Sequence, residues 1–518
     1  MRIGEVLNGV YDKSVGWRPA TGSIKPVHIA NGLFRDMMGG EVHDVESLLS
    51  FIVPWKKKET REPHPQRSYQ YLVHDIKDPR YSAFRDENYR DYFERLREFV
   101  RGLLAADGAV FPQAKITSFS LTCRQMITTD LMDKEVGRFM AQIIRGEDGD
   151  GPLAKLIVDC LKKDSDDPIT FLVSPLLSRD WKLISTKSDR CSPYDNKNLK
   201  GFSDLLEVAA KQLAEHEHQQ GNRLATLQRV VHFSCLALLA HAQALSAEGK
   251  LKNRVPLLLT METPKGSSLA RASEDSLITF YENFEDWLAK QIALRISDKK
   301  PLVYESEDDG KKEGLGPLPD RDKRTVRKYL SQISTYKGES ADRDLMDNRM
   351  SLYEQSLSRY PSKRKISDID DSQWVLILGE TIVQCYLNEY TSGGPREFLG
   401  GIGRKAGIIF PHFQGRSREK RVRPSVPILD LLVRSCCPIN EPIPLHQFLD
   451  RVWERFGIIV GGRLNEQSGD HELLTENRID VSQTDLEENT TAFVDNLVRI
   501  GLARRYPDNI AYVGKYHV

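Results

Sequence analysis

The segment from Val426 to Val518 constrains the fold of this chain most, because its apolar pattern changes from helical spacing to strand alternation in a fixed order. Three stretches with helical spacing come first, and two short alternating runs joined by a turn follow them. These elements are Val426–Cys437, Leu445–Phe456, Thr490–Ile500, a run from Gly501 to Tyr506, a Pro507-Asp508-Asn509 turn and Ile510–Val513. Three helices closed by a hairpin are typical of a winged helix, which usually binds DNA and less often another protein.

The length and charge of the chain limit its number of domains and the source of any affinity for nucleic acid. A chain of 518 residues can bury about two to four cores. Lysines and arginines equal aspartates and glutamates at 74 each, so any affinity for nucleic acid must come from local patches. The predicted elements indicate an α+β, helix-rich, multi-domain protein with a C-terminal winged-helix module.

The pattern along the chain divides it into five regions. The first region mixes strand-like runs at 48–54, 69–76 and 169–173 with helical patterns at 88–106, 136–144 and 153–161, whereas the later elements are mostly helical. The helices expected there are 202–218, 224–246, 276–296, 324–336, 345–359 and 372–390, with one strand at 255–260. The predicted regions are a mixed α/β N-terminal region (1–190), a helical middle (191–296), a flexible charged linker (297–324), a helical connector with a basic Gly-rich stretch (325–425) and the winged-helix domain (426–518) with an acidic insert (457–487).

Composition is the reason for placing a linker at 297–324. Fifteen of its 28 residues are charged, and it carries three prolines and three glycines. Such a segment buries too little apolar surface to offset the entropy of ordering it.

The basic Gly-rich stretch from Thr391 to Ser425 is the first candidate site. It holds eight Lys or Arg against Glu397 and Glu419, and clustered cations beside flexible glycines can follow a phosphate backbone. The residues expected to do so are Arg404, Lys405, Arg416, Arg418, Lys420, Arg421 and Arg423. The stretch can equally be a solvated linker or an arm held by a protein partner.

The cations of the predicted winged helix are the second candidate site. Arg499, Arg504 and Arg505 lie on its third helix or its wing, where phosphates would pass. The insert opposes this interpretation, because Glu466 to Glu488 holds eight acids and one arginine. We therefore expect either non-specific contacts with the DNA backbone or a protein-docking role.

No pattern indicates a reaction. The P-loop, zinc-protease, serine-hydrolase and kinase motifs are missing from the sequence, and no cofactor is expected. His216 and His218 are two residues apart, unlike the i, i+4 pair of a zinc site, so we expect no metal. Asp180-Trp181-Lys182 partly matches the Asp…(Asp/Glu)-x-Lys pattern of metal-dependent nucleases. A nuclease site in the N-terminal region therefore stays open as an alternative.

The compartment is inferred from three features. The N-terminus lacks the apolar run of a signal peptide. The most apolar helical stretch, 233–245, is shorter than the roughly 20 residues needed to span a bilayer. Seven scattered cysteines form no CxxC pair. These features predict a cytoplasmic protein without membrane contact.

The overall layout and the ending LARRYPDNIAYVG resemble accessory proteins of bacterial phage-defence operons. Among these the chain most resembles the non-catalytic components of methylation-associated defence systems. The resemblance implies a multi-protein complex whose other subunits include a methyltransferase, a specificity subunit and an ATPase.

These observations favour a non-enzymatic, DNA-associating subunit of a bacterial anti-phage defence complex. Two alternatives stay open at this point. One is an effector nuclease with an acidic site in the N-terminal region, and the other is a protein-docking scaffold whose winged helix binds a partner subunit.

Overall fold

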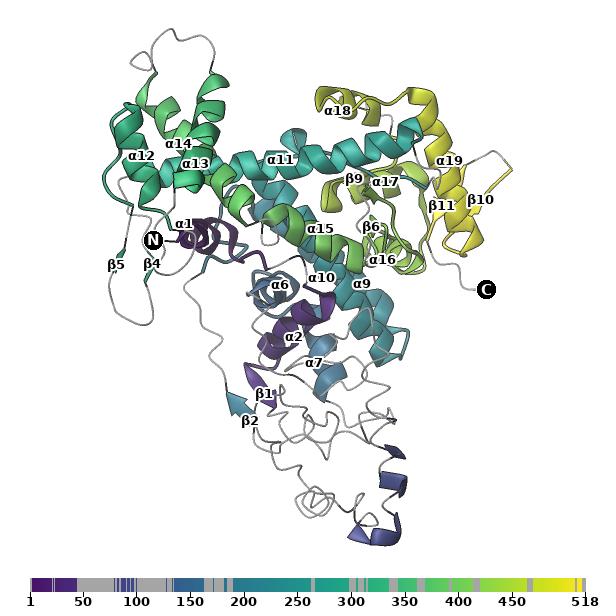
Figure 1. Ribbon diagram of the computed structural model, residues 1–518. Coiled ribbons are helices and arrows are strands. Elements are labelled where there is room, and N and C mark those ends of the chain that lie inside the picture. Colours follow the sequence, from purple (N-terminus) through teal and green to yellow (C-terminus); the bar gives the residue numbers. More distant parts are fainter. Residues whose placement is uncertain are drawn as a thin grey trace.

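The computed structural model consists mainly of helices, with four short pairs of strands and one three-stranded sheet among the residues it describes (Figure 1). It thereby confirms the expected helix-rich α+β class. The structure describes residues 2–20, 22, 24–43, 127, 133, 135–162, 171, 181–183, 190–261, 266–297, 304–305, 312–313, 315–334, 343–360, 369–390, 394–412, 420–463, 469–507 and 510–514, with scattered positions between 79 and 99.

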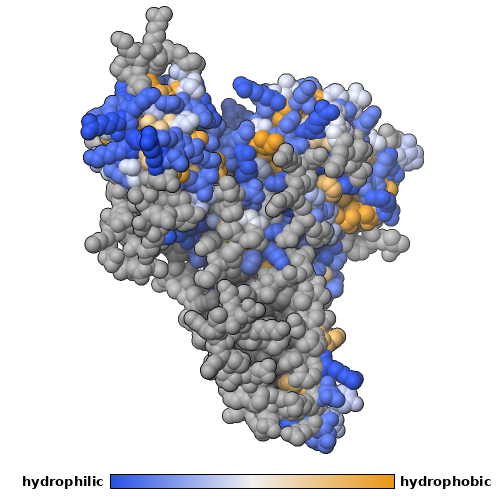
Figure 2. Space-filling model, in the orientation of Figure 1, coloured by the Kyte–Doolittle hydropathy of each residue, from blue (hydrophilic) through white to orange (hydrophobic). Residues whose placement is uncertain are grey.

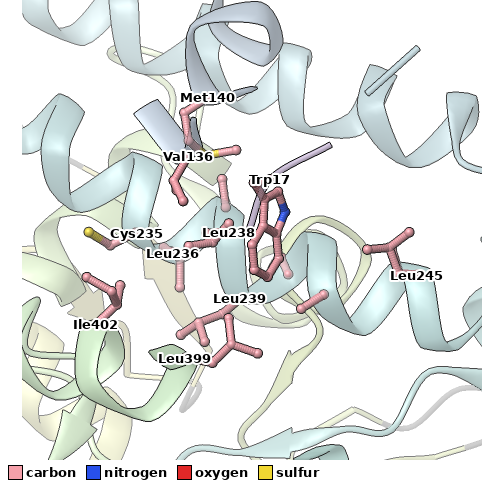
Figure 3. Close-up of a cluster of buried hydrophobic side chains, with 14 of the residues drawn as sticks. Trp17, Val136, Met140, Cys235, Leu236, Leu238, Leu239, Leu245, Leu399 and Ile402 are labelled. Atoms are coloured by element: carbon pink, nitrogen blue, oxygen red, sulfur yellow. The ribbon is translucent and has the colours of Figure 1, made fainter. Parts of the chain in front are cut away.

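Helix α10 (Arg223–Ser246) is the centre of the core. Every residue from Phe233 to Leu245 is buried. Figure 3 shows its leucines beside Trp17 of the N-terminal segment, Val136 and Met140 of α6, and Leu399 and Ile402 of α15. The helices packed around it include α9 (Lys200–His218), α2 (Pro26–Met37), α6 (Val136–Arg145) and α7 (Pro152–Lys162).

The apolar composition of α10 follows from this central position. Among the described helices it is the one that is long and apolar enough to cross a membrane, and 72% of its most apolar window is buried inside the protein. Its apolar residues are therefore buried by packing against neighbouring helices.

Two glycines allow α2 and α6 to approach closely. A Cβ atom on Gly137 would lie 2.3 Å from the backbone nitrogen of Leu33, and one on Gly32 would lie 2.0 Å from the Asp133 carboxylate. Asp133 in turn accepts a hydrogen bond from the Gly137 N–H at 2.8 Å. A larger side chain at Gly137 would push the two helices apart, and one at Gly32 would displace the Asp133 carboxylate that precedes α6.

The N-terminal segment forms helices that the sequence patterns did not indicate. Helix α1 (Ile3–Val10) continues into a π-helical turn, η1 (Tyr11–Val15), which ends at Gly16 with a left-handed φ of 90°. Trp17 follows and is fully buried against Phe398, with ring centroids 5.4 Å apart. The N-terminus is therefore part of the central core.

Helix α11 (Ser268–Ser297) connects the two upper ends of the molecule (Figure 1). Its 30 residues span about 45 Å, and it begins eight residues before the predicted start at 276. At one end it packs against α14 (Asp371–Glu389), beside α12 (Lys323–Ser331) and α13 (Arg343–Ser358). At the other end it packs against the C-terminal region.

The remaining predicted elements compare with the structure as follows. The helices expected at 136–144, 153–161, 202–218, 224–246, 345–359 and 372–390 each lie within two residues of an observed helix, whereas α12 ends at Ser331 rather than 336. The expected strand at 255–260 contains β3 (Leu257–Leu258). The predicted strands at 48–54 and 69–76 lie outside the described residues, and of 169–173 only Phe171 is described.

The basic Gly-rich stretch is a packed element over most of its described length, where its glycines are buried rather than part of a solvated linker. Helix α15 (Pro395–Lys405) is followed by β6 (Ile409–Phe410), which pairs with β7 (Arg421–Val422). Gly400, Gly401 and Gly403 are buried in α15. A Cβ atom on Gly401 would lie 2.9 Å from the Gly22 carbonyl oxygen, so this glycine permits close packing rather than mobility.

The C-terminal region contains three main helices and a three-stranded antiparallel sheet. In chain order its elements are α16 (Val426–Cys436), β8 (Ile443–Pro444), α17 (Leu445–Phe456), β9 (Ile458–Ile459), α18 (Asp470–Glu476), α19 (Gln483–Arg499), β10 (Ala503–Arg505) and β11 (Ala511–Val513). The sheet order is β10-β11-β8. Phe448 of α17 stacks on Phe493 of α19 with ring centroids 6.3 Å apart.

One large group of buried hydrophobic side chains extends from Ile3 to Val513 and includes residues from both sides of 297–324. Within that segment the structure describes the strand pair β4 (Tyr304–Glu305) and β5 (Lys312–Glu313) and residues from 315 onward. Strands β1 (Glu41–His43) and β2 (Trp181–Leu183) also pair, in antiparallel orientation. The predicted domain boundaries stay predictions.

Candidate interaction surface on the C-terminal region

Helix α19 presents one continuous stripe of side chains to solvent. Residues at spacings of three and four lie on one face of a helix, and this face lies opposite the buried Leu486, Phe493 and Leu497. The exposed members of the stripe are Thr484, Glu487, Glu488, Thr491, Asp495, Val498 and Arg499. Three acids against one arginine give the stripe a net negative charge, which is concentrated in its N-terminal two thirds.

The start of α19 explains why the sequence patterns did not assign these acids to a helix. The apolar spacing predicts a helix that starts at Thr490, so the sequence pattern assigns Glu487 and Glu488 to the acidic run before it. In the structure the Ser482 hydroxyl caps the helix by accepting a hydrogen bond from the Asp485 N–H at 3.0 Å. The Ser-x-x-Asp spacing of a helix start was the available signal.

Asn489 fixes the other side of α19 to the body of the protein. Its side-chain nitrogen donates to the carbonyl oxygens of Leu259 at 2.6 Å and Val460 at 2.8 Å. Its side-chain oxygen accepts from the Met261 N–H at 3.0 Å. Because Asn489 is buried, these bonds hold α19 in one orientation relative to β3 and β9.

The predicted acidic insert packs against the rest of the protein. Strand β9 pairs in parallel with β3, and Leu473 and Leu474 of α18 are buried in a second apolar cluster with Leu269 of α11. The buried Asp470 carboxylate accepts from the Arg463 guanidinium at 2.7 Å and from the Gly461 N–H at 2.9 Å. The insert therefore attaches the C-terminal region to the middle of the molecule.

A buried ionic network attaches α16 in the same way. Glu217 of α9 is fully buried and pairs with Arg434 of α16 at 3.3 Å and with Arg229 of α10. Arg434 also pairs with Asp430 at 2.7 Å. Removing one partner of such a buried network would leave an uncompensated charge.

The three cations expected on the winged helix are all exposed. Arg499 is the last residue of α19, and Arg504 and Arg505 lie on β10. Arg505 pairs with Asp495 of the stripe at 3.0 Å and donates to the Thr491 carbonyl oxygen at 3.3 Å. Arg499 and Arg504 thus form a small basic border at one end of an acidic helix face.

The cations expected in the Gly-rich stretch are engaged within the protein to differing degrees. Lys405 donates to the carbonyl oxygens of Gly22 and Ile24, and burial, together with Arg404 and Lys25, lowers its pKa to about 8. Arg404 is half-buried and donates to the Gly400 carbonyl oxygen. Neither side chain extends as a free arm.

The second half of that stretch shows the same behaviour where it is described. Arg421 is 3% exposed, and its guanidinium lies 5.0 Å from the centre of the Phe410 ring. Arg423 lies 5.2 Å from the same ring, and burial followed by Arg421 lowers its pKa. Lys420 lies 3.9 Å from Glu397.

Arg416 and Arg418 lie outside the described residues. Lys405 and Arg421 contact other parts of the protein and therefore do not belong to the candidate surface on α19.

The histidines considered for a metal site are core or surface residues. The ring of His216 hydrogen-bonds the Cys437 carbonyl oxygen at 3.0 Å, and His241 accepts from the Trp17 indole N–H at 3.4 Å. Burial lowers the pKa of His241 to about 3 and, with Arg229, that of His232 to about 4. Among the residues that the structure describes, no group of three or more His, Cys, Asp or Glu could hold a metal ion.

Asp180 of the partial nuclease motif lies outside the described residues. Six of the seven cysteines are described, and all six are free thiols.

Comparisons of the chain with family models, curated proteins and solved structures find no match. The surface must therefore be interpreted from its own geometry and charge.

Proposed function

We propose that residues 426–514 form a winged-helix module that docks a protein partner, as part of a non-enzymatic scaffold subunit. The order of α16, β8, α17, α19, β10 and β11 supports the winged-helix assignment, with β9 and α18 as an insertion between the second and third helices. The sheet order also fits, because the strand after the first helix pairs with the last strand of the hairpin.

The charge of the α19 stripe is the observation that favours docking to protein. In DNA-binding proteins of this type the exposed face of this helix enters the major groove, between two rows of phosphates. Here that face carries Glu487, Glu488 and Asp495, of which Asp495 is paired with Arg505 of β10. These carboxylates would repel the phosphates and could accept a base-edge donor only after losing their own hydration.

The partner best suited to this surface has a basic, partly apolar face. Complementary charges set the orientation and rate of association, while apolar side chains contribute the affinity. Among the described residues of the module, the exposed large apolar side chains are Val426, Val498, Tyr506 and Ile510. Figure 2 shows hydrophobic patches among hydrophilic side chains on the lobe that carries the module.

The resemblance to accessory proteins of phage-defence operons fits this proposal. A scaffold without catalytic groups of its own would hold other subunits, such as a methyltransferase or an ATPase, in one assembly. Membership of such a complex is part of the proposal.

A second candidate function is DNA association through the border cations. It is favoured by Arg499 and Arg504, which are exposed at the end of α19 and on the wing. Backbone contacts by these residues would not require α19 to enter a groove.

DNA binding separates the two functions. We expect full-length protein at low salt to show at most weak retention of duplex DNA, unchanged in the double variant Arg499→Glu, Arg504→Glu. The measurement is fluorescence anisotropy of a labelled duplex. Steeply salt-dependent binding that the double variant loses would replace the docking proposal with DNA association, since each phosphate contact contributes about 0.9 to the slope of log K against log salt.

A further inference from the structure

Helix α12 carries a dense basic face. Lys323, Arg324, Arg327 and Lys328 are all exposed, and helical spacing places them on one side of the helix, opposite the buried Val326, Tyr329 and Leu330. Among the described helices, no other has four exposed cations within six residues. α12 therefore carries the densest run of exposed cations among the helices that the structure describes.

The basic face and the acidic stripe lie at opposite ends of the molecule. Figure 1 shows α12 at one end of α11 and α19 at the other. The charged part of α12, from residue 323 to 328, is about 8 Å long, and the acids of α19, from 487 to 495, cover about 12 Å. The two surfaces are thus of similar size but too far apart to meet within one molecule.

The neighbours of the basic face favour a protein partner with separate acids over a continuous polyanion. Lys323 pairs with Glu354 at 2.6 Å and Arg327 pairs with Asp347 at 2.8 Å, all four side chains being well exposed. A phosphate backbone laid along α12 would meet those two carboxylates. An acidic helix face carries separate carboxylates, which can replace Glu354 and Asp347 at Lys323 and Arg327 because exposed pairs exchange partners at little cost.

We infer that the acidic stripe of α19 in one molecule docks on the basic face of α12 in a second copy of this chain. The inference rests on the docking role proposed above and names the partner. Each molecule then has one face of each sign, so association either closes as an antiparallel dimer or continues as a chain. The balance of 74 basic and 74 acidic residues leaves no net repulsion between copies.

A charge-exchange experiment tests the inference in the full-length protein. One variant makes α12 acidic (Lys323→Glu, Arg324→Glu, Arg327→Glu, Lys328→Glu), and another makes α19 basic (Glu487→Lys, Glu488→Lys, Asp495→Lys). A control matched to the α19 variant makes the same change of charge at three exposed acids elsewhere (Asp148→Lys, Glu215→Lys, Glu282→Lys). Molar mass is measured by sedimentation at about 20 mM and about 500 mM salt, where screening is weak and strong respectively.

Wild type and the control should show a mass above the monomer at low salt and lose it at high salt. Each α12 or α19 variant alone should be monomeric, because both of its faces then have the same sign. An equimolar mixture of the two variants should regain the higher mass, which a merely misfolded variant could not do.

Wild type that is monomeric at low salt, or a mixture that stays monomeric, would overturn the inference. So would loss of association in the control. If monomeric wild type retains duplex DNA and the acidic α12 variant does not, α12 binds a polyanion instead. Monomeric wild type, together with cross-linking to a different protein from a photoreactive residue placed at position 491, would leave the proposed function standing while this inference fails.

Discussion

His241 shows how a single buried side chain makes stability depend on pH. It is 1% exposed, it accepts a hydrogen bond from Trp17, and its ring lies 4.6 Å from the Phe139 ring. Because burial lowers its pKa from 6.5 to about 3, the folded protein keeps this ring neutral at pH values where the unfolded chain protonates it. The stability it contributes is therefore complete above pH 6.5 and is lost as pH falls toward the folded pKa.

We predict that the free energy of unfolding decreases more steeply with falling pH in wild type than in His241→Gln. One such histidine lowers the free energy of unfolding by about 1.4 kcal/mol for each pH unit below its unfolded pKa, or by about 2 kcal/mol between pH 6.5 and pH 5. Urea denaturation at pH 7, 6 and 5 measures both slopes. His218→Gln, at an exposed position of α9, is the control for replacing a histidine by glutamine. Equal slopes in wild type and His241→Gln would contradict the assignment.

At the scale of elements, the glycines of α15 show why composition misleads. A helix with several glycines is normally weak, because each costs about 1 kcal/mol relative to alanine. In α15 the glycines allow contact with backbone far away in the chain, as at Gly401 and Gly22. A contact across nearly 380 positions leaves no trace in local spacing.

The prediction for Gly401→Ala is therefore opposite in sign to that for Gly201→Ala. Gly201 lies in α9 with nothing within 4 Å of an added Cβ, so alanine should stabilise the protein by up to about 1 kcal/mol. Gly401→Ala should destabilise it by about 1–3 kcal/mol through overpacking. Thermal and chemical unfolding measure both changes. A stabilised Gly401→Ala would show that α15 is not packed as described.

Asn489 tests how α19 is held. Asn489→Ala leaves two buried carbonyl oxygens and one N–H without their partner, which should cost about 2–4 kcal/mol. The side chain of Asn496 bonds only within its own helix, to the Ala492 carbonyl oxygen and the exposed Arg499 guanidinium, so Asn496→Ala should cost less than about 1 kcal/mol. Chemical denaturation compares the two variants. Similar losses in both would mean that Asn489 does not attach α19 to β3 and β9.

At the scale of the whole molecule, the buried side chains form a continuous core across the predicted linker at 297–324. We expect limited proteolysis to cut first within that segment, as its charge and proline content predict. The two fragments should nevertheless stay together in gel filtration, because α11 and α14 pack across the cut. Fragments that separate as folded units would support independent domains instead.

The sequence predicted the parts of the fold that local periodicity determines. Helix α17 matches its prediction because its apolar face repeats at helical spacing, and α10 matches within a residue because its long apolar run contains no glycine or proline. The N-terminal helices, the packing of α15 and the true start of α19 depend on long-range burial or on a cap. Of the predicted site residues, Arg499, Arg504 and Arg505 lie on the surface, whereas Lys405 and Arg421 bond inward.

Site-specific cross-linking from the centre of the α19 stripe tests the central claim most directly. A photoreactive residue replaces Thr491 in the full-length protein expressed in its native host, and Glu215 on α9 carries the same residue as a control. Thr491 should cross-link to protein, either a second copy or another subunit, in a band that the Glu215 control does not give. Cross-links from Thr491 to DNA, with no protein adduct beyond the control, would contradict a docking role for this surface.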